Sequence, residues 1–434
     1  MNTQLSHAET QTVRSPHRSN PRNIVSALSV CMALQMTSFV MILPLFARRF
    51  TEFGAGVEAL GLSAMAYALT GTITAPIMGA LSDRFGRRLL ILGSLVVYVL
   101  AFSGYLIASS AEVFILLRGL TGTFTAGLVP AVLGVVADLA PTDRKAQWIG
   151  TVNGGASIGW IVGPIFGGML YDRWGYEVPL IGSISMAFVA FVVAFLTIKD
   201  LRGNVTHPHA AAVHMTMKFS LKAFRHSLPK SLSIFGVLLG ISFATMFAWA
   251  FIEPCFMFYA YDDLRWNSSM LGLVMSTYGI AMMLGEFGLS RLSDQLGRKP
   301  MILTGLLFFS AQFMGLAVSR DRILIAATFV IAGLGNALFD PALNAYILDI
   351  TPTEHHGRIL GIKSTAGSLG SILGPALGVL CTDILSAQGI FMIATGAVFL
   401  IALMFILTQT KSRLGKLGQV ESAVDPKMEY WNNR

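Results

Sequence analysis

Four ionisable residues lie inside long apolar stretches of the chain, where a charged side chain is unusual. They are one arginine and three acids, Arg118, Glu253, Glu286 and Asp340. A charge surrounded by hydrocarbon is costly, so it normally faces a cavity or a partner. A carboxyl group in such surroundings favours its uncharged form and can take up a proton near neutral pH. These residues therefore indicate reversible binding of protons or charged ligands inside a membrane.

Each of the four residues also has a purely structural interpretation. Arg118 can extend its side chain to the outer membrane interface, and Glu253 lies near the end of its apolar stretch. Asp340 precedes Pro341 and can bond the backbone groups that a proline leaves free. Glu286 can face a structural partner. The residue types alone leave these alternatives open.

The stretches that hold these residues have the length and composition of membrane-spanning helices. The chain has 434 residues, of which 54% are hydrophobic and 12% are charged, whereas soluble domains carry about 25% charged residues. Apolar runs of about 20 residues are needed to cross the hydrocarbon core as helices. The sequence predicts twelve such helices, at 24–47, 58–82, 88–108, 111–136, 148–170, 178–198, 232–257, 268–291, 300–318, 322–347, 359–382 and 388–408.

The second half of the chain repeats the first at a constant offset in residue number. Tyr67 and Gly163, for example, recur as Tyr278 and Gly374, and no insertion is needed to align the two copies. Each copy has six predicted spans, an even number, so both copies cross the membrane in the same orientation. We expect an all-α membrane protein of two pseudo-symmetric six-helix bundles, with the functional site between them.

The buried charges do not follow this repeat. Apolar residues stand in the first half at the positions that correspond to the three acids, and Arg118 corresponds to Phe329. A shared cavity with a cationic N-terminal side and an acidic C-terminal side would have this distribution.

The distribution of positive charge predicts the orientation of the chain. The formal net charge is +8, from 31 Lys and Arg against 23 Asp and Glu. If residues 1–23 are cytoplasmic, only six arginines fall on the outside and Arg118 lies in the membrane, so cytoplasmic segments hold the rest. The excess of positive charge thus reflects the orientation of the chain in the membrane and does not indicate nucleic-acid binding. We expect cytoplasmic tails at 1–23 and 409–434, bundles at 24–198 and 232–408, and a cytoplasmic linker at 199–231, in a cell membrane.

Two corresponding loops carry a glycine, an acid and arginines between spans. The first holds Gly79, Asp83, Arg84, Gly86 and Arg87, and the second holds Asp294, Gly297 and Arg298. The glycine permits a tight turn and the cations hold the loop in the cytoplasm. Anchoring needs only positive charge, so the repeated acid predicts a further role, such as pairing with a cation or capping a helix N-terminus.

The first loop resembles the signature loop of the major facilitator superfamily, and the arrangement of six plus six spans agrees with that family. The resemblance implies that Asp83 holds the outward-open state through the eleventh helix, and that Arg87 pairs with Asp138 at the end of the fourth. It implies the corresponding roles for Asp294 and Asp349. We call the contact of the loop acid with the facing helix a latch, and the latch of Asp294 should be weaker because the second loop departs further from the signature. The resemblance also favours Asp340 and Glu253 for coupling, because the tenth and seventh helices line the family's cavity.

The fifth predicted helix carries glycines four residues apart, a pattern that lets a helix approach another backbone closely. The motif residues are Gly159, Gly163, Pro164, Gly167 and Gly168. This pattern resembles the signature of the drug:proton antiporter branch of the same family, which implies export.

Methionines and aromatic residues on the first and seventh spans predict an adaptable apolar pocket, although lipid-facing packing is the alternative for any one of them. The candidates are Met36, Phe39, Met246 and Trp249. The three cysteines have no metal-ligand spacing. No nucleotide-binding P-loop, nucleophile constellation or cofactor fingerprint occurs, so we expect no cofactor, no metal and no enzymatic activity.

These observations predict a secondary transporter, most simply a monomer, that exports amphiphilic or drug-like molecules in exchange for protons by alternating access. A proton-coupled importer of a metabolite is the alternative within transport. A membrane sensor or scaffold that does not transport is the alternative from another class.

Overall fold

The computed structural model describes residues 21–141, 144–198, 229, 231–289, 296–352 and 355–424. Within these ranges it describes side chains up to residue 410, apart from those of Asp83 and Ala146. Asp294 and nearly all of the predicted linker lie outside the described residues.

The first six predicted spans form an N-terminal bundle. The first span is broken at Pro44, where α1 passes through a short 3-10 turn, η1, into α2. The fourth span is divided into α5 and α6. The bounds are α1 (Pro21–Ile42), η1 (Leu43–Leu45), α2 (Phe46–Glu52), α3 (Val57–Phe85), α4 (Arg87–Ile107), α5 (Ala111–Thr125), α6 (Leu128–Leu139), α7 (Lys145–Trp174) and α8 (Glu177–Thr197).

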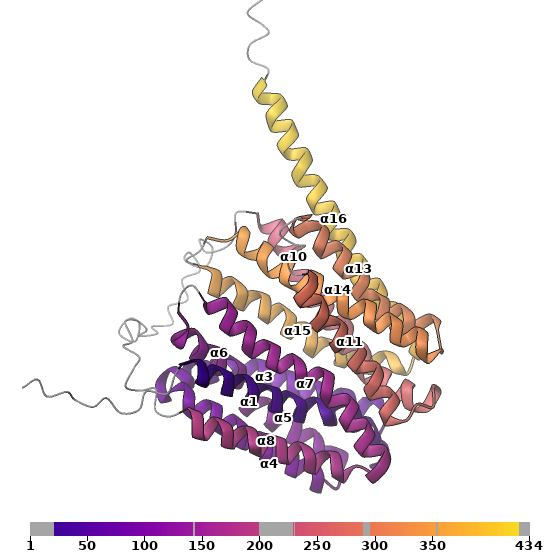
Figure 1. Ribbon diagram of the computed structural model, residues 1–434. Helices are drawn as coiled ribbons and strands as arrows, with labels where there is room; N and C mark the ends of the chain where they lie inside the picture. The colour runs from indigo at the N-terminus through magenta and orange to yellow at the C-terminus, as the bar shows by residue number, and fades with distance from the viewer. Residues whose placement is uncertain are drawn as a thin grey trace, which may run out of the picture.

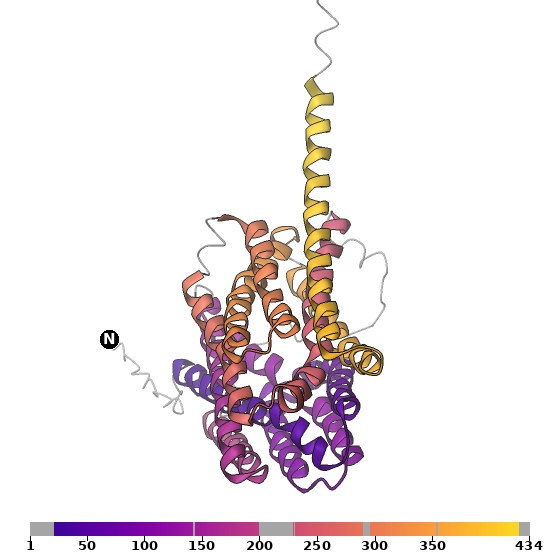
Figure 2. The ribbon, with the colours of Figure 1, turned by 90° about the vertical axis from the view of Figure 1, so that its right-hand side faces the viewer.

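The last six predicted spans form a C-terminal bundle. The bounds are α10 (Leu232–Phe258), the π-helical turn η3 (Tyr259–Asp263), α11 (Ser268–Leu289), α13 (Arg298–Val318), α14 (Arg322–Asp349), α15 (His356–Thr382) and α16 (Ala387–Val424). α16 continues beyond the predicted end of the span at 408 and projects from the bundle as one long helix (Figures 1 and 2).

Eleven helical segments in the described part of the chain are long and apolar enough to cross a membrane. α7 is not among them, but it is 30 residues long and packs between α1 and α11 in the centre of the molecule. We therefore count α7 as the twelfth span, in agreement with the number predicted from the sequence.

The two bundles lie side by side, and their chain ends share one end of the molecule (Figure 1). We call this the linker end, since α1 and α10 begin there and α8 and α16 leave there. The opposite end is the distal end. Two corresponding turns at the linker end are made by Gly86 and Gly297, whose φ angles of 92° and 89° favour glycine, as the sequence predicted.

Candidate functional site

The two bundles are joined tightly at the distal end. The Asp172 carboxylate, at the end of α7, accepts hydrogen bonds from the backbone N–H groups of Ser268 (3.0 Å) and Ser269 (2.8 Å) and so caps α11. A carboxylate at this position also interacts favourably with the helix dipole. Deeper in this interface between the bundles, which we call the seam, the Ser276 hydroxyl donates to the Ile161 carbonyl at 2.7 Å.

A second set of distal contacts joins the end of α1 to the turn after α10. The Tyr261 hydroxyl donates to the Pro44 carbonyl at 3.1 Å. Arg48 lies over the Tyr261 ring, 3.9 Å from its centroid, and donates to the Trp266 carbonyl at 3.4 Å. Together with the Asp172 cap, these contacts close the distal end.

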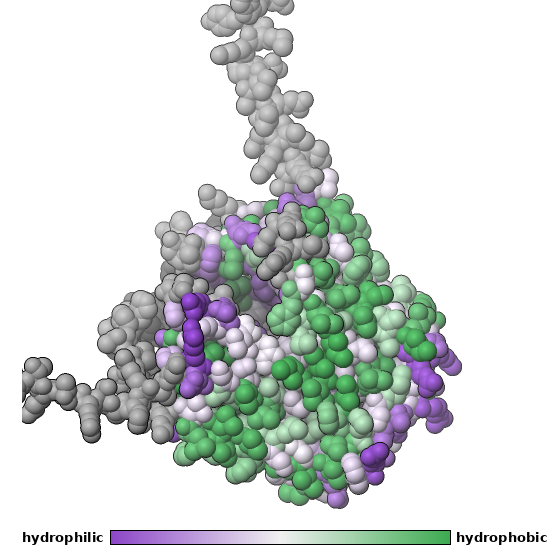
Figure 3. Space-filling view, in the orientation of Figure 1, coloured by the Kyte–Doolittle hydropathy of each residue, from purple (hydrophilic) through white to green (hydrophobic). Residues whose placement is uncertain are grey.

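The same seam is open at the linker end. Figure 3 shows a recess between the bundles on this side. At the distal end, by contrast, a Cβ added at Gly272 of α11 would strike the backbone at Pro164 of α7. The space between the bundles is therefore reached from the linker end.

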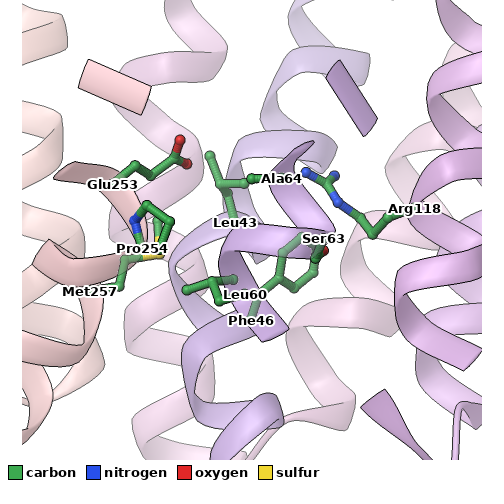
Figure 4. A pocket seen from close by; sticks show the side chains of 9 residues that line it. All are labelled: Leu43, Phe46, Leu60, Ser63, Ala64, Arg118, Glu253, Pro254 and Met257. Atoms are coloured by element: carbon green, nitrogen blue, oxygen red, sulfur yellow. The ribbon is translucent and has the colours of Figure 1, made fainter. Parts of the chain in front are cut away.

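A small cavity lies at the closed end of this space, with walls from both bundles (Figure 4). Arg118 and Ser63 line it from the N-terminal bundle, and Glu253 and Met257 line it from the C-terminal bundle. The cavity volume is about 10 Å³, which is room for roughly one water molecule. A larger ligand would need the wider space towards the linker end.

Arg118 is held in an aromatic cage. Only 4% of the residue is exposed, so its side chain does not extend to the membrane interface. The guanidinium carbon lies 4.4 Å from the ring centroid of Tyr67, 5.1 Å from that of Phe46 and 5.8 Å from that of Phe39. Its Nε and Nη1 atoms are buried without a hydrogen-bond partner. Ring faces thus supply the partial negative charge that a carboxylate would otherwise provide.

Glu253 faces this arginine across the cavity from α10, directly before Pro254, which lies inside the helix. Among the described residues its carboxyl group forms no ion pair and no side-chain hydrogen bond. The two charged groups therefore share one cavity without neutralising each other by direct contact, and both keep capacity for a ligand or a proton.

Asp340 belongs to a separate cluster nearer the linker end. Its carboxylate lies 2.8 Å from the Lys363 ammonium group of α15, and the Asn344 amide bridges the two, at 3.1 Å from Asp340 and 2.8 Å from Lys363. The Asp340 side chain is 45% exposed, so it faces the recess. Asp340 therefore bonds a lysine rather than the backbone near Pro341.

The sequence interpretation missed this cluster because it assigned Lys363 to the cytoplasmic end of its span. A recognisable signal was available in α14, where Asn336, Asp340 and Asn344 recur every four residues and so share one helix face. The Asn336 amide contacts the Tyr278 hydroxyl of α11, which extends this polar face.

The other candidates are distributed over both bundles. Phe39 joins the Arg118 cage and stacks on Tyr67, whereas Met36 packs against α7 at Gly159. Met246 is 44% exposed and contacts α15, and Trp249 packs against the core of the C-terminal bundle. Glu286 is exposed on α11. Of the predicted apolar pocket, only Phe39 therefore lies beside the central charges.

At the linker end the structure brings the loop arginines to the predicted acids. Arg87 and Asp138 form an ion pair at 3.0 Å, and Arg298 and Asp349 form the corresponding pair at 3.5 Å. Arg84 is exposed and lies over the Phe85 ring. The side chain of Asp83 and the whole of Asp294 lie outside the described part, so the latch to α15 stays a prediction.

The glycine motif of α7 serves two interfaces. Gly159, Gly163 and Gly167 pack against the α1 backbone, within one bundle. Gly168 instead packs against the backbone of Ser268 in α11, across the distal seam. Pro164 lies inside α7 without ending the helix. The motif thus joins α7 to its own bundle and to the other one.

Comparison with known proteins decides the family. A family model described as Major Facilitator Superfamily matches residues 26–259 and 238–433. The chain belongs to this superfamily. Among the described residues no group of three His, Cys, Asp or Glu is placed to hold a metal ion.

Several curated relatives carry names of drug efflux proteins. The "Multi-drug resistance efflux pump PmrA homolog" of Lactococcus lactis is 26% identical over 341 residues, which cover 77% of this chain and 82% of that protein. The "Multidrug resistance protein MdtG" of Escherichia coli is 25% identical over 388 residues, which cover 87% and 92%.

Solved structures share the fold. A bacterial homologue of the human lysosomal transporter Spinster, described as inward-facing and occupied, aligns with a TM-score of 0.70 at 14% identity, over 91% of this chain and 98% of that one. The human organic anion transporter MFSD10 aligns with a TM-score of 0.64 at 19% identity, over 89% and 100%. At these identities the likeness concerns the fold alone.

Proposed function

We propose that this chain exports amphiphilic, drug-like molecules from the cell in exchange for protons, with Glu253 as the coupling acid. The observation that carries this proposal is an unpaired carboxyl group beside a caged arginine, at the closed end of a space that opens on one side. The names of the efflux relatives support export, and so does the resemblance of the α7 glycine motif to the signature of the antiporter branch.

The proposed mechanism uses the two ends in turn. With the linker end open, a substrate enters the recess, approaches Arg118 and Glu253, and displaces a proton from Glu253. The bundles then rock, so the distal contacts of Asp172 and Tyr261 separate and the linker end closes. Protonation of Glu253 from the distal side lowers the affinity for the substrate and releases it. One chain encloses the whole path, so we expect the monomer to be active.

The two candidate acids for coupling differ in their surroundings. The Asp340 carboxylate is paired with an ammonium group at 2.8 Å, and Asn344 bonds both partners. Among the described residues Glu253 has no such partner. We therefore assign proton coupling to Glu253, and assign to Asp340 and Lys363 a polar surface along which the substrate enters.

The decisive measurement is substrate flux in proteoliposomes with an imposed pH gradient. We expect a panel of lipophilic compounds to include some that accumulate against their gradient only while the pH gradient is present. An ionophore that dissipates protons should stop accumulation but leave exchange intact. Accumulation that depends on sodium and ignores the pH gradient would contradict proton coupling.

We propose that the linker end faces the cytoplasm, since it carries most of the Lys and Arg. A membrane-impermeant thiol reagent applied to intact cells should modify Ser109→Cys, which is exposed at the distal end, in a cysteine-free background. It should not modify Ser220→Cys in the linker. The reverse labelling pattern would invert the topology and turn the proposed exporter into an importer.

We further propose that Asp83 latches the alternative, distal-open state by capping α15. Asp83→Asn should then shift the population towards the state described here, by roughly ten- to a hundred-fold if one charge-assisted contact of about 1.5–3 kcal/mol is lost. Distances between spin labels at the two ends would report this shift. Asp294→Asn is the matched control and should shift the population less.

A further inference from the structure

An open pocket of about 790 Å³ lies on the distal surface of the C-terminal bundle, away from the central cavity. Two turns form its walls, the one between η3 and α11 and the one between α13 and α14. Three arginines line it, Arg265, Arg320 and Arg322. The sequence places six arginines outside the membrane on the distal side, so half of them converge on this pocket.

The three arginines carry free positive charge. Among the described residues none of them forms an ion pair, a hydrogen bond or a ring contact. Asp321, the acid that lines the same pocket, uses its Oδ1 atom to accept from the backbone N–H groups of Ile323 (2.9 Å) and Leu324 (2.8 Å), and so caps α14. The arginines are thus available to a ligand from outside the chain.

The repeat shows that the fold does not require these charges. Arg265 corresponds to Gly54, and both residues have the left-handed backbone conformation, with φ angles of 53° and 72°. A turn in this conformation favours glycine, since a side chain at positive φ costs free energy. The first half uses glycine, whereas the second half keeps an arginine despite that cost. Arg320 and Arg322 likewise correspond to uncharged residues, Ser109 and Ala111.

The pocket borders the apolar surface of the bundle. Leu273, one of its lining residues, is 49% exposed, and Ile323 and Leu324 beside it are 74% and 51% exposed. Figure 3 shows hydrophilic residues at the edge where these turns lie, next to a broad hydrophobic surface. A ligand in this position can place an anionic group on the arginines and an acyl chain on the leucines and isoleucine.

We propose that this pocket binds the phosphate of an anionic phospholipid headgroup in the leaflet at the distal face. Arginine suits this ligand because its planar guanidinium group forms paired hydrogen bonds with phosphate oxygens. The proposal is independent of what the central cavity transports.

The test is native mass spectrometry of the protein released from nanodiscs that contain phosphatidylcholine with or without phosphatidylglycerol. The wild-type protein should retain phosphatidylglycerol. Each of Arg265→Gly, Arg320→Gln and Arg322→Gln should lower retention about fivefold, because each cation near an anionic lipid surface strengthens binding by about that factor. The triple variant should therefore lower retention about a hundredfold.

The matched control is Arg173→Gln, which removes an exposed distal arginine from the N-terminal bundle and should leave lipid retention unchanged. Arg265→Gly separates binding from folding, because the variant relieves the left-handed arginine and should retain or raise the melting temperature in detergent. Equal retention by the triple variant and the wild type would overturn the proposal, as would an equal loss in Arg173→Gln.

The source of the phosphate group is tested separately. Millimolar inorganic phosphate should neither displace phosphatidylglycerol nor raise the melting temperature of the lipid-free protein in a way that depends on the three arginines. If it does both, the pocket binds a soluble anion and the lipid assignment is wrong.

Discussion

The two bundles hold a buried or half-buried cation in opposite ways. In the N-terminal bundle the partners of Arg118 are aromatic rings, and Tyr67 is the nearest. In the C-terminal bundle the partner of Lys363 is a carboxylate, and Tyr278, which corresponds to Tyr67, bonds Asn336 instead. A cation neutralised by a carboxylate has little charge left for a ligand, whereas one held by ring faces keeps most of it. The repeated scaffold thus holds a cation with available charge in the N-terminal bundle and a neutralised cation in the C-terminal bundle.

The strongest test of this comparison is neutralisation of Glu253, which forms no ion pair among the described residues. Glu253→Gln should abolish accumulation driven by a pH gradient, because a neutral amide mimics a carboxyl group that never releases its proton. Downhill exchange of substrate should largely survive. Flux in proteoliposomes with and without the gradient measures both.

Glu286→Gln is the matched control for that variant, since it neutralises an exposed acid of α11 outside the central cavity. It should reduce accumulation far less. If Glu253→Gln still concentrates substrate at the wild-type rate, the coupling acid lies elsewhere and Glu286 becomes the leading candidate.

The aromatic cage gives the next largest expected effect. Tyr67→Leu removes the closest ring from Arg118, and a desolvated cation–π contact contributes about 2 kcal/mol. We expect transport in both modes to fall by roughly ten- to thirty-fold. Tyr278→Leu, the same change at the corresponding position, removes only a bond to Asn336 beside the recess and should cost about threefold or less. The initial transport rates of both variants test this expectation. Equal losses of rate would show that the two tyrosines do not differ in their importance for transport.

The ion pair of the C-terminal bundle should matter less. Asp340→Asn and Lys363→Gln should each lower the transport rate by about fivefold or less, because partly exposed pairs contribute about 1 kcal/mol or below. Neither variant should uncouple transport from the pH gradient. The double variant should be no worse than either single one, since each change already removes the pair. Loss of accumulation in Asp340→Asn with exchange intact would restore Asp340 as the coupling acid.

Sequence reasoning predicted the fold well because a membrane restricts a chain to long apolar helices, and the repeat fixed their grouping. It also predicted the tight turns at Gly86 and Gly297. Partners across helices were harder to predict. Lys363 looked like an interfacial cation because its depth in the membrane depends on where α15 begins, at His356.

The contacts between the bundles at the distal end could likewise not be predicted from the sequence. The sequence repeats Asp172 at Asp383, but nothing in this pattern shows that Asp172 caps α11 in the other bundle. Such contacts depend on which of two states the bundles occupy, and one sequence specifies both states. Helix positions could therefore be predicted from the length and composition of the apolar runs, whereas contacts between the two bundles could not.

The smallest expected difference concerns the two ion pairs at the linker end. Arg87 and Asp138 lie 3.0 Å apart with side chains that are 29% and 30% exposed, whereas Arg298 and Asp349 lie 3.5 Å apart and Asp349 is 55% exposed. Water screens the second pair more strongly, so Asp138→Asn should destabilise its bundle more than Asp349→Asn. Both effects should stay below about 1 kcal/mol, so melting temperatures at low and high salt are the suitable measurement. The loss in each variant should shrink as salt rises, because dissolved ions screen partly exposed charge pairs. A larger loss in Asp349→Asn at low salt would mean that the second loop, despite its weaker likeness to the family signature, holds the stronger contact.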